Sequence, residues 1–62
     1  MIRIAIVDDK ASNRNVLKDK LRRNLLFNII LEATDGEVFL NQMKELTEEN
    51  LPHIVLMDLE MP

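Results

Sequence analysis

Residues 2–9 read "IRIAIVDD", and this stretch decides the fold of the chain. Apart from Arg3, residues 2–7 are β-branched or small, and apolar side chains occupy both alternating positions. This pattern predicts a strand that is buried on both faces, as in a parallel sheet covered by helices. Two carboxylates, Asp8 and Asp9, follow the strand directly.

Two further segments carry strand signals. Residues 29–34, "IILEAT", predict a second strand, and residues 53–57, "HIVLM", predict a third. A polar loop, "TEENLP" at residues 47–52, precedes the third strand. If the strands are parallel, each connection must bring the chain back to the end of the sheet at which the strands begin.

Apolar residues at helical spacing fill the two intervals between the strands. The first helix, which Asn24 and Asn28 are expected to end, carries leucines four residues apart at Leu17, Leu21 and Leu25. The second helix is expected from about Glu37 to Leu46, with an apolar face made of Phe39, Met43 and Leu46. Asp35, in the turn signal before Gly36, is able to cap this second helix.

The resulting order is strand, helix, strand, helix, strand. Such alternation predicts an α/β fold with a parallel three-stranded sheet, right-handed crossovers and helices on both faces. With 62 residues, the chain is expected to be one domain spanning residues 1–62, with marginal stability.

The composition excludes several classes of protein. Apolar residues make up 47% and charged residues 31%, a globular balance, and no cysteine is present for a disulfide or a thiolate metal site. A formal net charge of −3 argues against a nucleic-acid partner. No secretory signal and no long apolar run occur, so we expect a cytoplasmic protein without a membrane partner. A basic cluster is expected to be a solvated helix face or, alternatively, a docking face for an acidic partner: Lys10, Arg14, Lys18, Lys20, Arg22 and Arg23.

Carboxylates end the first and third predicted strands. Parallel strands end at one edge of a sheet, so Asp8, Asp9 and Asp58 meet there if these strands are neighbours. Their mutual repulsion calls for a cation, and carboxylate oxygens suit Mg²⁺. Alternatively, Asp8 and Asp9 cap the following helix, as Ser12 also could, and Asp58 is a turn residue.

The whole chain resembles the N-terminal half of a response-regulator receiver domain, the phosphoacceptor of two-component signalling. The matching stretches are "IAIVDD", Arg14 with Leu17 and Leu21, "EATDGE", and "IVLMDLEMP" at the C-terminal end. The resemblance implies a truncated flavodoxin-like fold with strand order 2-1-3.

The resemblance also implies a site. Asp58 would be the phosphorylated residue, and it would be a ligand of Mg²⁺ (or Mn²⁺) as well. Asp9 would bind the metal directly, Asp8 directly or through water, and Glu60 through its backbone carbonyl. The phosphoryl group would come from a histidine kinase or a phosphotransfer protein, and the chain itself would not be an enzyme.

The chain also departs from the family. The Ser or Thr and the Lys that complete the switch would lie on two further strands, and both are absent, so we expect an incomplete switch. Phe39 replaces a residue that is usually small. The third strand would become a sheet edge, which favours a homo-oligomer through this strand or the open sheet face.

Two other functions stay open for this sequence. One is an inactive, self-associating structural fragment. The other, more remote, is a D-x-D-type phosphohydrolase, although Glu60 stands where the second aspartate should be. The sequence argues further against dinucleotide binding, because the chain has one glycine and no G-x-G-x-x-G motif.

Overall fold

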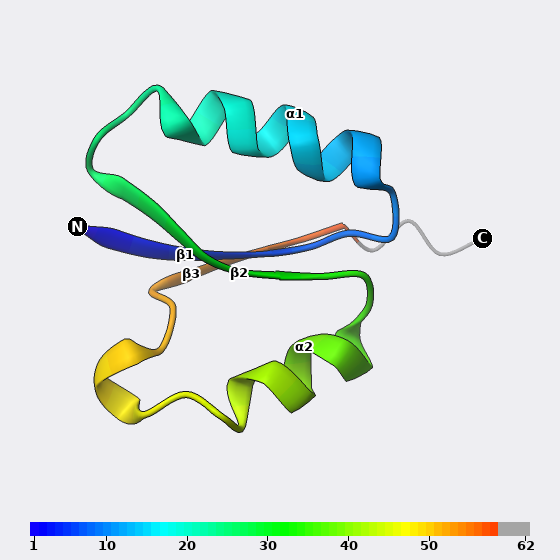
Figure 1. Cartoon of the computed structure of the whole chain (residues 1–62), viewed down its shortest axis with the longest axis vertical. Coiled ribbons are helices and arrows are strands. Elements are labelled where there is room, and N and C mark those ends of the chain that lie inside the picture. Colours follow the sequence, from blue (N-terminus) through cyan, green and yellow to red (C-terminus); the bar gives the residue numbers. More distant parts are fainter. Residues whose placement is uncertain (59–62) are drawn as a thin grey trace.

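The computed structural model describes residues 1–58; residues 59–62, and with them Glu60, lie outside the described part. Three parallel strands form one sheet in the order β2-β1-β3, with α1 on one face and α2 on the other (Figure 1). This confirms the predicted fold class and strand order. The elements in chain order are β1 (Ile2–Val7), α1 (Ala11–Arg22), β2 (Phe27–Ala33), α2 (Gly36–Met43), a 3₁₀ turn η1 (Glu48–Asn50) and β3 (Ile54–Met57).

β1 is the central strand, and its position explains why residues 2–7 are apolar at both alternating positions. Ile4, Ala5 and Ile6 are at most 2% exposed. Because successive side chains point to opposite faces, Ile4 and Ile6 lie on the α1 side and Ala5 on the α2 side. The predicted burial on both faces is confirmed.

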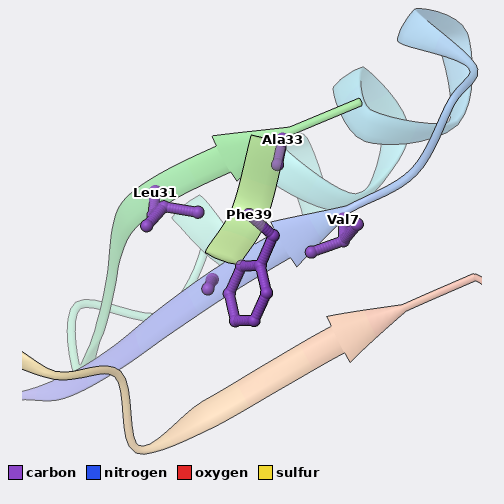
Figure 2. Close-up of a cluster of buried hydrophobic side chains, with 5 residues drawn as sticks. Val7, Leu31, Ala33 and Phe39 are labelled. Carbon is purple, nitrogen blue, oxygen red and sulfur yellow. The ribbon is translucent and has the colours of Figure 1, made fainter. Parts of the chain in front are cut away.

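The buried cluster on the α2 side is centred on an aromatic ring. Phe39 packs against Ala5, Val7, Leu31 and Ala33 (Figure 2). Three of these neighbours are small or β-branched, which leaves room for the ring over the sheet. Met43 and Leu46 pack against the same cluster, so the predicted apolar face of the second helix is confirmed.

The α1 side is held partly by charged groups. Glu32 of β2 lies 3.1 Å from Lys18 Nζ and 3.5 Å from Arg14 Nε. α1 contains no fully buried residue, and Leu17 and Leu21 are half-buried against the sheet. Leu25 was predicted on the same stripe, but it lies beyond the end of α1 and is 86% exposed.

Several element ends differ from the prediction. α2 ends at Met43 and not at Leu46, because Glu45 N–H and Leu46 N–H bond to carbonyls three residues back and tighten the chain into a turn. β2 spans residues 27–33 rather than 29–34, because Phe27 is recruited into pairing with Ile2.

The start of β3 also differs. His53 precedes the strand, where its N–H donates to Arg3 O at 2.8 Å and its Nδ1 accepts Arg3 N–H at 2.9 Å. His53 therefore joins the chain before β3 to Arg3 of β1 without being part of the strand.

β3 is one edge of the sheet formed by residues 1–58. Ile54, Val55 and Met57 are 39 to 41% exposed, far more than the residues of β1. Among the described residues, no helix is long and apolar enough to cross a membrane.

Candidate functional site

The carboxyl ends of β1 and β3 lie side by side. Val7 pairs with Met57 in the parallel register, and Asp58 N–H donates to Val7 O at 3.0 Å. Asp8 and Asp58 therefore leave adjacent strands at the same edge of the sheet. Both line an open hollow of about 500 Å³, called here the Asp8–Asp58 hollow. Its other lining residues come from α1 and β3: Asn13, Val16, Leu17, Leu56 and Met57.

Asp8 is a buried carboxylate, only 3% exposed. The backbone N–H of Lys10 donates to Asp8 Oδ1 at 2.9 Å and, as the largest influence, holds the pKa of this carboxyl below its ordinary value. Burial opposes this shift, while the side chains of Asn13 and Asp9 and the charge of Arg14 add to the lowering of the pKa. Asp8 is therefore ionised at neutral pH, as a ligand for a cation must be.

The loop that carries Asp8 is fixed to α1. Arg14 Nη1 donates to the backbone carbonyl of Asp8 at 2.6 Å, and the same side chain reaches Glu32 of β2. Arg14 thus joins the end of β1, the first turn of α1 and the neighbouring strand. This contact gives Arg14, which is in the basic cluster and among the residues that match the family, a positioning role at the site.

The structure contradicts the alternative in which Asp8, Asp9 or Ser12 caps α1. The N-cap position of α1 is Lys10, and no side chain makes a capping hydrogen bond there. Ser12 lies inside the helix, and Asp8 accepts from Lys10 N–H in the preceding loop instead of from the first turn of α1. Asp8 consequently remains part of the hollow.

The third predicted carboxylate, Asp9, is exposed on the loop next to Asp8, and Asp58 is exposed as well. Within residues 1–58, no three carboxylate, imidazole or thiolate groups are arranged to hold a metal ion. The structure thus brings Asp8 and Asp58 together, while Asp9 is not among the residues that line the hollow. Two carboxylates still suit Mg²⁺ chemically, because this ion keeps several of its waters.

Asn13 is a site residue that the sequence prediction of the metal ligands missed. It lines the hollow, and its side chain helps to lower the pKa of Asp8. The available signal was its place in the first turn of a helix that starts at the acidic edge of the sheet. Polar residues there face the strand ends only if the helix is rotated suitably about its axis.

The fold and the hollow define a class of protein. The strand order 2-1-3 reverses at β1, so the gap between β1 and β3 is the switch point where open α/β sheets bind ligands. Asp8 and Asp58 give this switch point its acidic character. The chain is thus a parallel α/β protein with an acidic site at its strand ends.

Comparison with known proteins narrows the class to a family. The chain is 42% identical over 60 residues to chemotaxis protein CheY of Bacillus subtilis, covering 97% of this chain and 46% of that protein. It is 38% identical over 61 residues to the protein-glutamate methylesterase/protein-glutamine glutaminase of Sulfurimonas denitrificans, 98% of this chain and 16% of that one. The probable transcriptional regulator ycf27 of Guillardia theta is 35% identical over 60 residues, 97% of this chain and 21% of the regulator.

These relatives, together with the fold, show that the chain belongs to the response-regulator receiver family. The chain spans less than half the length of the curated relatives it matches. No model of a protein family matches the chain. No solved structure matches it at comparable significance.

Proposed function

We propose that Asp58 accepts a phosphoryl group from a phosphohistidine on a histidine kinase or phosphotransfer protein. The observation that carries this proposal is the pairing of Val7 with Met57, which sets Asp58 beside the ionised Asp8 at one hollow. The hollow is open, so a partner's imidazole could approach Asp58 directly.

In the proposed reaction, a carboxylate oxygen of Asp58 attacks phosphorus while the bond from phosphorus to the imidazole nitrogen breaks. The imidazole leaves with that electron pair, and Asp58 becomes an acyl phosphate that water can hydrolyse. Asp8, Asp9, Asp58 and the backbone carbonyl of Glu60 would hold Mg²⁺ (or Mn²⁺), which would offset charge on the phosphoryl oxygens. Arg14 keeps Asp8 in place through the Asp8 carbonyl.

A mass measurement tests the proposal. The 62-residue chain is incubated with acetyl phosphate and MgCl₂, and its intact mass is recorded. We expect a gain of one phosphoryl group that Asp58→Asn abolishes and EDTA prevents. Asp19→Asn, a change of an exposed aspartate on the outer side of α1, should leave the gain intact. Unchanged modification of the Asp58→Asn chain would contradict the assignment.

The alternative is an inactive fragment that associates with itself. The exposed apolar residues of β3 favour it, because an edge strand offers unpaired backbone groups to a second copy. The mass measurement described above distinguishes the two functions. An inactive fragment gains no phosphoryl mass at any Mg²⁺ concentration, whereas a phosphoacceptor gains it whether or not the chain associates.

A further inference from the structure

The turn after α1 carries two leucines that point into solvent. Leu25 is 86% exposed and Leu26 is 62% exposed, more than any large apolar residue inside the sheet or helices. The cations Lys20, Arg22 and Arg23, all exposed, precede them directly. Residues 20–26, called here the basic leucine turn, lie at the end of α1 away from the β1–α1 loop that carries Asp8 (Figure 1).

Backbone hydrogen bonds fix this turn. Asn24 N–H donates to Leu21 O at 3.2 Å, and Asn24 Oδ1 accepts Leu26 N–H at 2.9 Å. Leu26 O in turn accepts Ile2 N–H at the start of β1, at 2.6 Å. The backbone that carries the two leucines is therefore tied to the start of the sheet.

Charge is distributed unevenly along the chain. Residues 18–28 contain four basic residues and one acid, while residues 29–62 contain one basic residue and eight acids. Lys18 is engaged by Glu32, but within residues 1–58 the cations of the basic leucine turn form no ion pair. The turn is a local cationic patch on an acidic protein.

We propose that the basic leucine turn binds the surface of an anionic lipid bilayer. Exposed leucines can enter the boundary between headgroups and acyl chains while lysine and arginine side chains meet the negative headgroups. The sequence-based expectation of no membrane partner rests on the lack of a spanning segment. Peripheral binding requires no such segment.

An acidic peptide is the competing occupant, and the structure disfavours it. The groove beside the turn, of about 220 Å³, is lined by Lys18, Leu21, Arg22, Phe27, Asn28, Ile29 and Glu32. Acids of a peptide lying there would meet the Glu32 carboxylate, which already neutralises Lys18. The leucines, by contrast, protrude, and a fluid surface accepts a protruding side chain without a matching pocket.

The acidic remainder of the molecule does not prevent this contact. α1 has 12 residues and is about 18 Å long at 1.5 Å per residue, with the loop that carries Asp8 at one end and Arg23, Leu25 and Leu26 beyond the other. At physiological salt, charges are screened beyond about 8 Å. The lipid-bound chain would keep Asp58 directed away from the surface, so this inference stands whether or not Asp58 is phosphorylated.

Sedimentation with vesicles tests the proposal. The 62-residue chain is mixed with phosphatidylcholine vesicles that contain about 30% phosphatidylserine, or none, at low and high salt. We expect sedimentation with the anionic vesicles only, weakened by salt. Since each basic residue near the surface strengthens binding about fivefold, Arg22→Gln with Arg23→Gln should lower the partition coefficient about 30-fold. Lys44→Gln, an exposed cation on the α2 side, should have little effect.

Tryptophan fluorescence gives a second readout, because the chain contains no tryptophan. Leu25→Trp should shift its emission to the blue with anionic vesicles, while Leu40→Trp, on exposed α2, should not. Equal binding to zwitterionic vesicles, or no binding to anionic ones, overturns the proposal. Capture of polyglutamate in place of vesicles, lost in the double arginine variant, overturns it in favour of an acidic protein partner. Circular dichroism confirms that each variant is folded.

Discussion

At the residue scale, Asp8 links the stability of the chain to pH. The pKa of Asp8 in the fold is below its ordinary value of 3.8, chiefly because Lys10 N–H donates to the carboxylate. A carboxyl whose pKa is lowered by folding stabilises the native state above its ordinary pKa, and this contribution is lost as pH falls through the folded value. Asp8 therefore contributes at pH 7 and ceases to contribute in strong acid.

We predict that Asp8→Asn lowers the free energy of unfolding at pH 7 and that the difference from the wild type narrows below about pH 3.8. Urea titrations in EDTA at several pH values measure this, since EDTA removes any contribution from a bound metal. Asp19→Asn, at an exposed position, is the control, for which a change within about 0.5 kcal/mol is expected. A gap between Asp8→Asn and wild type that stays constant down to pH 2 would falsify the linkage.

Phe39 is the other residue on which the fold depends. Its ring fills the space over Ala5, Val7, Leu31 and Ala33, so the bulky residue at a position that is usually small in receivers adds packing here. We predict that Phe39→Ala costs about 3–5 kcal/mol, because it removes buried area and leaves a cavity. Loss that large approaches the whole stability of a small domain.

Far-UV circular dichroism of the Phe39→Ala chain should accordingly report a largely unfolded protein at 25 °C. Phe39→Leu keeps most of the buried volume and should remain folded, with a lowered urea midpoint. Leu40→Ala, one residue along on the exposed side of α2, is the matched control and should change the midpoint little. A Phe39→Ala chain as stable as this control would show that the ring does not hold α2 on the sheet.

At the element scale, the two helices begin differently. Asp35 caps α2, with its Oδ1 accepting Val38 N–H at 2.8 Å, as its place before Gly36 predicts. Ser12 provides no cap for α1. We predict that Asp35→Ala lowers stability by about 1 kcal/mol and Ser12→Ala by nearly nothing, measured as urea midpoints at equal m-values. Equal losses from the two substitutions would mean that the Asp35 hydrogen bond does not stabilise α2.

The element ends show what local sequence could not predict. A leucine at every fourth residue placed Leu25 on the helical stripe, but the chain leaves the helix after Arg22, where Asn24, one of the two residues expected to end it, bonds its own neighbours in a turn. Phe27 joins β2 because Ile2 faces it across the sheet, a partner 25 positions away in the sequence. The spacing of apolar residues therefore predicted which helices and strands form. Hydrogen bonds that this spacing does not reveal determine where they begin and end.

The candidate site also contains residues that the sequence predicted and one that the sequence prediction missed. Asp8 and Asp58 could be predicted to meet, because parallel strands end at one edge and their residues follow the strands directly. The contribution of Asn13 was missed, although Asn13 lies four residues before Leu17 and so shares the helix face that packs on the sheet. The spacing was read for its apolar residues alone.

At the scale of the whole molecule, the sheet formed by residues 1–58 leaves β3 as an edge. Its exposed Ile54, Val55 and Met57 carry no charge that would discourage pairing with another chain. Two copies related by a two-fold axis could join their β3 strands antiparallel. A strand of four residues gives an interface well below the roughly 800 Å² per partner of stable complexes, so association should be weak.

We predict that the chain is monomeric at micromolar concentration and forms dimers as the concentration rises, measured by sedimentation equilibrium. Added salt should favour the dimer, because each copy carries a formal net charge of −3 and salt screens the repulsion. Val55→Lys should suppress the dimer, since it places a charge in the middle of the edge strand, 39% exposed in the monomer. Leu40→Lys introduces the same charge on α2 and should leave association unchanged if β3 is the interface. If Val55→Lys and Leu40→Lys suppress the dimer equally, the change in net charge explains the effect and β3 is not the interface.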